Sequence, residues 1–560
     1  MRKAALEFSL LFCLLIGWYI LWAGVMVARW GLIPEDAAAR TLQAAQVFYG
    51  RDPKLSNLGF VWPPMPALLQ LPLVLLPGLW PTGLCGAVVS ALAGALAGAL
   101  LNETARALGW DRARYLLVGA FALNPAVTSV SAGGLSEPLL MAAALGQVRC
   151  FLGWAEAEAR ADRRRSVGWL FGLGLAGALG VLTRYEGWLL AAVMGLMVVV
   201  LALRRGNAGA AEAAVLVYGA PPAYAAFVWA FFNWLVMKDP LYFWRGPYAT
   251  LAYVLAEGTT PNPIGRAGAV LVGVWQLSPL FLPALVSAIG LGLARGRLPV
   301  LLVAGYWLSL PAFLAFSRGL GQVLDVQYRY LTPLVPATLC LVTLTLARIP
   351  ADWRLGAGLA LLVLGPATGL LGMWADPAPL GNSLKPFAEA LLSGRPVQAW
   401  AAERELAAYL RESGAGPVLT DPAGGVEMVV FFSGQPARFV LPADRDFEAI
   451  LENPVGKASH VLVPSPTGAG SLHAINRAFS GFYESGAAWA VLEKEVGPYR
   501  LYRVLGPQPP EGRVSARAAG LPTPVWVKPA VLSLLGLGIL GLAIVLGRRI
   551  GPILVWSRPE

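Results

Sequence analysis

Long apolar stretches separated by short polar loops recur through most of the sequence. They are about 17–25 residues long, the length at which a helix spans the roughly 30 Å hydrocarbon core of a bilayer. We expect crossings at residues 6–28, 84–104, 115–131, 138–155, 167–183, 187–203, 213–236, 267–293, 299–316, 331–347, 355–374 and 528–547. The pattern therefore predicts an α-helical polytopic membrane protein with about twelve transmembrane helices.

A further apolar segment, residues 62–80, decides the orientation of the chain. It contains prolines at positions 63, 64, 66, 72 and 77, and proline interrupts the hydrogen-bond ladder of a helix. If this segment crossed the membrane, the arginine cluster at residues 163–165 would lie outside, whereas short cytoplasmic loops normally hold the positive charge. As a broken helix in the outer interface, the segment leaves every basic cluster and both chain termini in the cytoplasm.

Residues 377–525 have the composition of a soluble protein. Short apolar runs at residues 417–421, 429–432, 438–441 and 460–464 predict strands, and residues 403–412 and 472–479 have helical patterns. We expect a transmembrane domain over residues 1–376 with interfacial helices in its first outer loop. A small extracytoplasmic α/β domain over residues 377–525 follows, and residues 526–560 form a final transmembrane helix with a cytoplasmic tail.

Composition and charge exclude several classes of protein. Only 13% of the residues are charged and 57% are hydrophobic, whereas a soluble domain carries about 25% charged residues. The net charge of +11 comes from short basic clusters between apolar stretches, so we expect no nucleic-acid partner. The four cysteines lie in apolar segments, which is typical of core residues. Arginine outnumbers lysine and no organelle signal is present, so a bacterial plasma membrane is the expected location.

Acids and arginines gather at the predicted outer ends of the spans. These residues are Glu35, Asp36, Glu137, Arg184, Glu186, Arg245, Arg329 and Tyr330. A carboxylate can act as a general base, and an arginine can hold a phosphate and stabilise it as a leaving group. Together they point to glycosyl transfer from a sugar carried on a lipid phosphate.

Most of these residues also have a structural interpretation. Glu35 and Asp36 favour a helix N-terminus, and Glu137 before Pro138 fits a helix start. Arg184 and Glu186 fit a structural ion pair, and Arg245 among aromatic residues fits an interfacial anchor. Their joint occurrence on one face favours the functional interpretation.

The order of short motifs resembles a known family. The motifs, in chain order, are Pro34-Glu35-Asp36, the small-residue stretch from Ala37 to Gly50, Trp62-Pro63-Pro64, Gly134-Leu135-Ser136-Glu137-Pro138, Thr183-Arg184-Tyr185-Glu186-Gly187-Trp188 and Arg329-Tyr330-Leu331-Thr332-Pro333. Residues 6–375 resemble the C-type superfamily of integral-membrane glycosyltransferases. The resemblance is to the branch of protein O-mannosyltransferases and lipid A aminoarabinose transferases. Trp62 stands where that family has a histidine.

The resemblance implies inverting transfer of a monosaccharide from a polyprenyl-phosphate donor to an extracytoplasmic acceptor. Glu35 matches the family's first acid and Asp36 its second, in reversed order, which leaves open which of them is the base. By the same analogy, Arg329 and Tyr330 bind the donor phosphate. The acceptor (glycan, lipid or protein), the sugar and any role of a divalent cation stay open.

Two other classes of function remain. A transporter or lipid flippase is the main alternative, but transporters place ionisable residues or broken helices near the bilayer midplane, and here the charges lie at span ends. A receptor or assembly protein would use residues 377–525 for binding, and it would not need acids in three separate outer loops.

Overall fold

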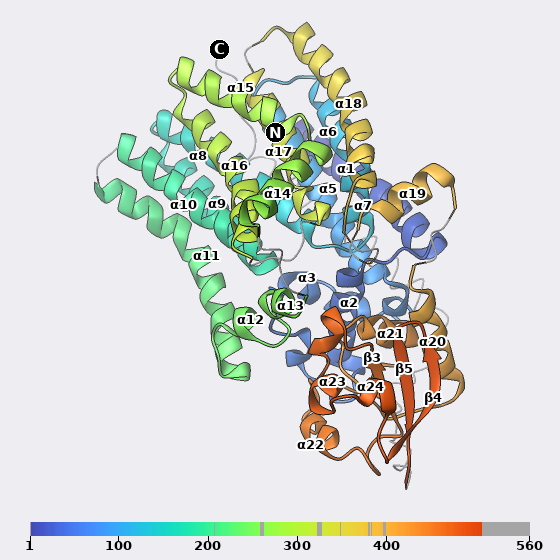
Figure 1. The fold of residues 1–560 in the computed structure, drawn as a ribbon. Helices are drawn as coiled ribbons and strands as arrows, with labels where there is room; N and C mark the ends of the chain where they lie inside the picture. The colour runs from blue at the N-terminus through green and yellow to red at the C-terminus, as the bar shows by residue number, and fades with distance from the viewer. Residues whose placement is uncertain are drawn as a thin grey trace.

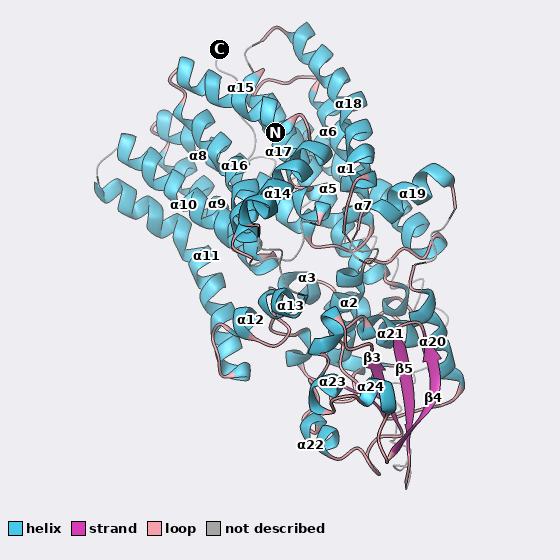
Figure 2. Cartoon of the chain, viewed as in Figure 1, coloured by secondary structure: helices cyan, strands magenta, loops and turns pink. Residues whose placement is uncertain are grey.

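The computed structural model describes residues 2–205, 208–257, 262–321, 327–347, 349–378, 381, 383–395 and 399–506. A helical bundle occupies one end of the molecule and a small β-sheet the other, with the helices of the first outer loop between them (Figure 1). Strands occur only beyond the bundle in the described part of the chain (Figure 2). The predicted crossing at residues 528–547 and the tail lie outside the described residues.

Eight helices are long and apolar enough to cross a membrane, and each coincides with a predicted crossing. They are α1 (Arg2–Ala23) with its π-helical extension η1 (Gly24–Arg29), α5 (Leu84–Ala107), α8 (Glu137–Ala159), α9 (Arg163–Thr183), α10 (Tyr185–Arg205), α11 (Ala208–Met237), α16 (Leu298–Gly319) and α18 (Ala351–Trp374). The chain is therefore a multi-pass membrane protein.

Three predicted crossings differ from single straight helices. Residues 115–131 form α6 (Arg114–Ala122) and α7 (Pro125–Ala132), bent by 62° where the Asn124 side chain caps α7. Residues 267–293 form α14 (Pro263–Leu277) and α15 (Phe281–Ala294), bent by 93°. Residues 331–347 contain only α17 (Leu334–Thr345), which has 12 residues and is about 18 Å long at 1.5 Å per residue. Counting each bent pair as one span gives up to ten spans in the described part of the chain.

The first outer loop consists of short helices, as its prolines predict. They are α2 (Glu35–Tyr49), η2 (Leu55–Leu58), α3 (Met65–Leu68), α4 (Leu71–Val74) and η3 (Trp80–Thr82). The second large loop, between α11 and α14, contains α12 (Tyr242–Arg245) and α13 (Thr250–Glu257). Figure 1 shows α2, α3, α12 and α13 between the bundle and the sheet.

Residues 383–506, here called the C-terminal region, contain a five-stranded sheet in the order β2-β1-β3-β5-β4. Its strands are β1 (Val418–Leu419), β2 (Phe439–Val440), β3 (His460–Pro464), β4 (Ala490–Val496) and β5 (Tyr499–Val504). Strands β2, β1 and β3 are parallel, while β5 is antiparallel to both β3 and β4. Its helices are α19 (Lys385–Ser393), α20 (Ala401–Glu412), α21 (Val426–Ser433), η5 (Pro436–Arg438), α22 (Phe447–Glu452), η6 (Gly468–Leu472), α23 (Ala474–Ala478) and α24 (Phe482–Ser485).

The prediction of a strand at residues 429–432 is wrong, because these residues lie in α21. A run of four apolar residues fits a buried helix as well as a buried strand. Gly425 and Gly434 adopt positive φ angles of 84° and 66° at the two ends, which glycine alone adopts at little cost. Residues of α21 and α2 share one continuous hydrophobic core with the spans, so the C-terminal region packs against the first outer loop.

Candidate active site

The two adjacent acids occupy the first turn of α2, and Asp36 points toward the bundle. Pro34 precedes the helix with an extended backbone, and no side chain caps its N-terminus. The Asp36 carboxylate lies 2.7 Å from Nη2 of Arg329 and 3.8 Å from Nη2 of Arg40. Asp36 therefore serves as the ion-pair partner of a distant arginine.

Arg329 comes from η4 (Tyr328–Leu331), the short turn before α17. It is 1% exposed, and its Nε donates to Gln327 at 2.6 Å. The Tyr330 ring lies 5.0 Å from the Arg329 guanidinium carbon and 4.8 Å from that of Arg184. A buried guanidinium is stable only with anionic or hydrogen-bonding partners, and Asp36 and Gln327 supply them.

Arg184 occupies the extended link between α9 and α10. Its Nη1 donates to Glu137 and to Ser136, both at 3.0 Å. Its Nε and Nη2 form a two-pronged pair with Glu186 at 3.2 and 2.7 Å. Glu137, in the first turn of α8, also lies 3.8 Å from Nε of Arg329. The predicted ion pair of Arg184 and Glu186 thus exists, and it is part of a larger network.

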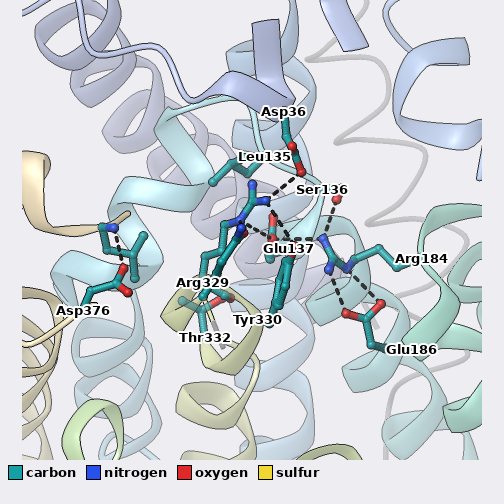
Figure 3. Close-up of polar contacts among 12 residues, drawn as sticks. Asp36, Leu135, Ser136, Glu137, Arg184, Glu186, Arg329, Tyr330, Thr332 and Asp376 are labelled. Carbon is teal, nitrogen blue, oxygen red and sulfur yellow. Dashed lines mark hydrogen bonds and ion pairs between the residues drawn. The ribbon is translucent and has the colours of Figure 1, made fainter. Parts of the chain in front are cut away.

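Six predicted residues from four separate segments converge in this way, as Figure 3 shows. We call this set the charge cluster; it comprises Asp36, Glu137, Arg184, Glu186, Arg329 and Tyr330. Arg245 is not in it. That residue is exposed on α12, and its side chain makes no hydrogen bond or ion pair with the described part of the chain.

Sequence reasoning missed Arg40, which lies one turn beyond Asp36 on α2. Its guanidinium is buried and lies 4.7 Å from the centre of the Trp62 ring. Among the described residues, Nε and Nη1 of Arg40 and Nη1 of Arg329 have no hydrogen-bond partner. Buried donors are normally satisfied, so these open nitrogens suit an added anion. The spacing of four residues from Asp36 was the available signal.

Glu35 points away from the charge cluster, toward the C-terminal region. Its backbone N–H donates to the Gly381 carbonyl at 3.0 Å. Its carboxyl is hydrogen-bonded to the carboxyl of Glu427, in the first turn of α21. Glu427 was likewise missed, and no local pattern in the sequence marks it.

The two adjacent acids differ in their affinity for protons. Burial raises the pKa of Asp36, but attraction by Arg329 and Arg40 outweighs this and leaves the pKa below its usual value. Burial also raises the pKa of Glu35. The hydrogen bond to Glu427 lowers this pKa and the charge of Asp36 raises it further, so the net pKa lies above its usual value. Asp36 is therefore held as an anion, whereas Glu35 retains a proton to higher pH.

Within the described residues, no group of three or more His, Cys, Asp or Glu side chains is arranged to hold a metal ion.

No protein-family model and no curated protein sequence matches the chain. Solved structures do match. The crystal structure of ArnT from Cupriavidus metallidurans bound to undecaprenyl phosphate covers 90% of this chain and 98% of its own, at 15% identity and a TM-score of 0.51. The fold is similar to that of ArnT. At this identity the similarity to ArnT concerns the fold alone.

Two further structures are similar to a lesser degree. The apo form of the same ArnT covers 88% of this chain and 99% of its own, with 16% identity and a TM-score of 0.48. The arabinofuranosyltransferase AftD from Mycobacteria covers 88% of this chain and 40% of its own, with 14% identity and a TM-score of 0.41. The resemblance of the motifs to the branch of lipid A aminoarabinose transferases is thus accompanied by a fold similar to that of ArnT.

Proposed function

We propose that this chain is a membrane glycosyltransferase. It would move a monosaccharide from a polyprenyl-phosphate donor to an extracytoplasmic acceptor, with inversion at the sugar carbon. The observation that carries the proposal is the charge cluster, with its open arginine nitrogens beside the paired acids of α2. The ArnT structure with undecaprenyl phosphate bound supports a donor of this kind.

The donor phosphate would lie against Arg329 and Arg40. Nη1 of Arg329 and two nitrogens of Arg40 have no partner in the described part of the chain, and guanidinium groups hold phosphate oxygens in a two-pronged manner. Glu137 and Glu186 hold Arg184 in place, which keeps a third positive charge near the leaving phosphate. Arg245 has no role in this arrangement.

Glu35 is the better general base of the two acids. Asp36 is committed to Arg329 at 2.7 Å and has a lowered pKa, whereas an efficient base has a pKa near the working pH. The acceptor's O–H proton passes to a Glu35 oxygen while the acceptor oxygen bonds to the sugar C1. The bond from C1 to the phosphate oxygen breaks, and its electron pair leaves with the phosphate, whose charge the arginines stabilise.

We also propose the orientation that the charge pattern predicts. About twelve crossings, including residues 528–547, would place both termini in the cytoplasm of a bacterial cell. The charge cluster and residues 377–525 would then face outward from the plasma membrane.

The test is transfer of labelled sugar. Purified protein in nanodiscs is given polyprenyl-phosphate sugars and envelope glycan, lipid and protein acceptors, and the inversion of the product is read by NMR. Arg329→Gln and Glu35→Gln abolish transfer, and Arg245→Ala is the matched control on the same face. Full activity in the double variant Glu35→Gln/Asp36→Asn would refute the mechanism. Movement of the lipid across the bilayer without transfer would favour a flippase.

A further inference from the structure

We propose that Glu427, from the C-terminal region, is a positioning residue of the active site whose carboxyl holds Glu35 in a pair that shares one proton. The inference rests on the proposed glycosyl transfer with Glu35 as base. It assigns a role to a segment that carries none of the motifs on which the resemblance depends.

The backbone around Glu35 is fixed by contacts from the C-terminal region. The Trp400 indole N–H donates to the Ile33 carbonyl at 2.9 Å, and Arg404 donates to the Gly31 carbonyl at 3.1 Å. A Cβ atom at Gly381 would lie 2.9 Å from Oε2 of Glu35 and 2.5 Å from the Trp400 ring. A side chain at position 381 would therefore displace Glu35 or Trp400, and the first turn of α2 is packed closely against this part of the chain.

Glu427 reaches Glu35 because of how α21 begins. The turn Pro422-Ala423-Gly424-Gly425 precedes the helix, and Gly424 and Gly425 adopt φ angles of 73° and 84°. Glu427 N–H donates back to the Pro422 carbonyl at 3.3 Å, which places its side chain in the first turn of α21. Oε2 of Glu427 is buried and has no hydrogen-bond partner among the described residues, and the carboxyl is hydrogen-bonded to that of Glu35.

The charges around the pair favour retention of a proton. Besides Glu427, Glu35 faces Asp36 on its own helix, Arg329 of η4 and Glu403 of α20. Glu427 also faces Asp36, and the hydroxyl-bearing neighbours are Tyr253 of α13 and Tyr499 of β5. These neighbours of Glu35 thus contribute two further carboxyls and one guanidinium. Two ionised carboxylates in contact would repel strongly at this burial.

The chemical effect falls on the base. Burial, followed by the charge of Glu35, raises the pKa of Glu427 well above its usual value, and the pKa of Glu35 is raised as well. Glu427 therefore keeps the proton of the pair and donates a hydrogen bond to the Glu35 carboxylate. This bond lowers the pKa of Glu35 against the rise caused by burial, so Glu35 ionises more readily and can accept the acceptor's proton. Without Glu427, burial and the charge of Asp36 would remain, and Glu35 would ionise only at higher pH.

The decisive variant is Glu427→Leu, which keeps a similar side-chain size but removes the hydrogen-bond donor to Glu35. The acidic limb of kcat/KM against pH shifts up by about one unit or more, while KM for the donor stays within about twofold because Arg329 and Arg40 are untouched. Glu427→Asp, which shortens the reach of the carboxyl, shifts the limb in the same direction by less, and Glu427→Gln, which keeps a donor, restores the wild-type limb. A limb that coincides with wild type in folded Glu427→Leu overturns the proposal.

Glu493→Leu is the matched control. Glu493 is a carboxylate of β4 that accepts from Tyr409 at 2.8 Å and lies 3.2 Å from His460, away from α2. Its removal leaves the acidic limb in place. A shift of the same size in this control would show that the effect is general, which also overturns the proposal.

Infrared difference spectroscopy tests the pair without substrate. At pH 7, the spectrum of wild type minus Glu427→Gln shows a protonated carboxyl band, and the corresponding spectrum for Glu493→Gln shows none. Absence of the band from the first spectrum overturns the shared proton, whatever the activity. Absence of sugar transfer in wild type, with the band present, instead refutes the proposed function and leaves the pair intact.

Discussion

The ion pair between Asp36 and Arg329 joins the first outer loop to the turn before α17, and a double-mutant cycle measures its strength. Asp36→Asn and Arg329→Gln each remove one charge, and the double variant removes both. The side chain of Arg329 is 2% exposed and that of Asp36 is 17% exposed. Loss of one partner of a buried pair costs about 3–5 kcal/mol, because the other charge is left unpaired.

The two single variants differ because their remaining partners differ. In Asp36→Asn, Arg329 keeps Glu137 at 3.8 Å and Gln327 at 2.6 Å, so we expect a cost of about 2–3 kcal/mol. In Arg329→Gln, the ion-pair partner that Asp36 keeps among the described residues is Arg40, at 3.8 Å, and we expect about 3–5 kcal/mol. The double variant loses less than the sum of the two, by at least about 1 kcal/mol.

The assay is equilibrium unfolding in mixed micelles with a rising fraction of sodium dodecyl sulfate, read by tryptophan fluorescence. All four proteins are measured at pH 7 and at low and high salt. A buried pair is screened little by salt, so the coupling free energy should change little between the two. If the single effects add to within about 0.3 kcal/mol, the contact does not contribute as argued.

Three further predictions follow from the same contacts. Arg40→Met removes a buried cation with unsatisfied nitrogens, so we expect KM for the polyprenyl-phosphate donor to rise about tenfold or more. The free energy of unfolding should stay unchanged or increase. An unchanged KM in steady-state transfer assays would contradict the role of Arg40 in binding the phosphate. Arg245→Ala leaves kcat/KM within about twofold, since the residue is exposed and lies outside the charge cluster; a loss of tenfold would mean that α12 moves onto the donor. Because the folded protein holds the Glu427 proton more tightly than the unfolded chain, the stability from this group is complete below about pH 4.3 and is lost as the pH rises through the folded pKa. The unfolding free energy of Glu427→Gln should therefore rise relative to wild type between pH 5 and 8, and parallel pH curves would count against the raised pKa.

The sequence predicts the spans well because span length depends on bilayer thickness alone. The breaks in α6–α7 and α14–α15 were not predicted, although Asn124-Pro125 and Ser278-Pro279 are local signals for a helix break; the long apolar patterns around them dominated the prediction. The helix α21 was misjudged for a related reason, because its four apolar residues fit either element.

The charge cluster could be predicted because its members lie at helix ends on one predicted side of the membrane. Arg184 and Glu186 flank one hairpin, and Glu137 begins α8. Glu427 could not be found in this way, since its contact depends on how the C-terminal region packs against α2. Arg245 shares the same predicted side, but α12 holds it away from the other residues.

The length of α11 has a consequence for the lipid around the protein. With 30 residues, α11 is about 45 Å long, against roughly 30 Å of hydrocarbon. Phe231, Trp234 and Val236, in its last turns, remain exposed. A helix that is apolar to its end must tilt, kink or thicken the adjacent bilayer, and α11 contains Pro221 and Pro222, at which it can kink. The loop that contains α12 and α13 follows the C-terminal end of α11 (Figure 1). Membrane thickness would therefore set the position along the membrane normal at which this loop meets the C-terminal region.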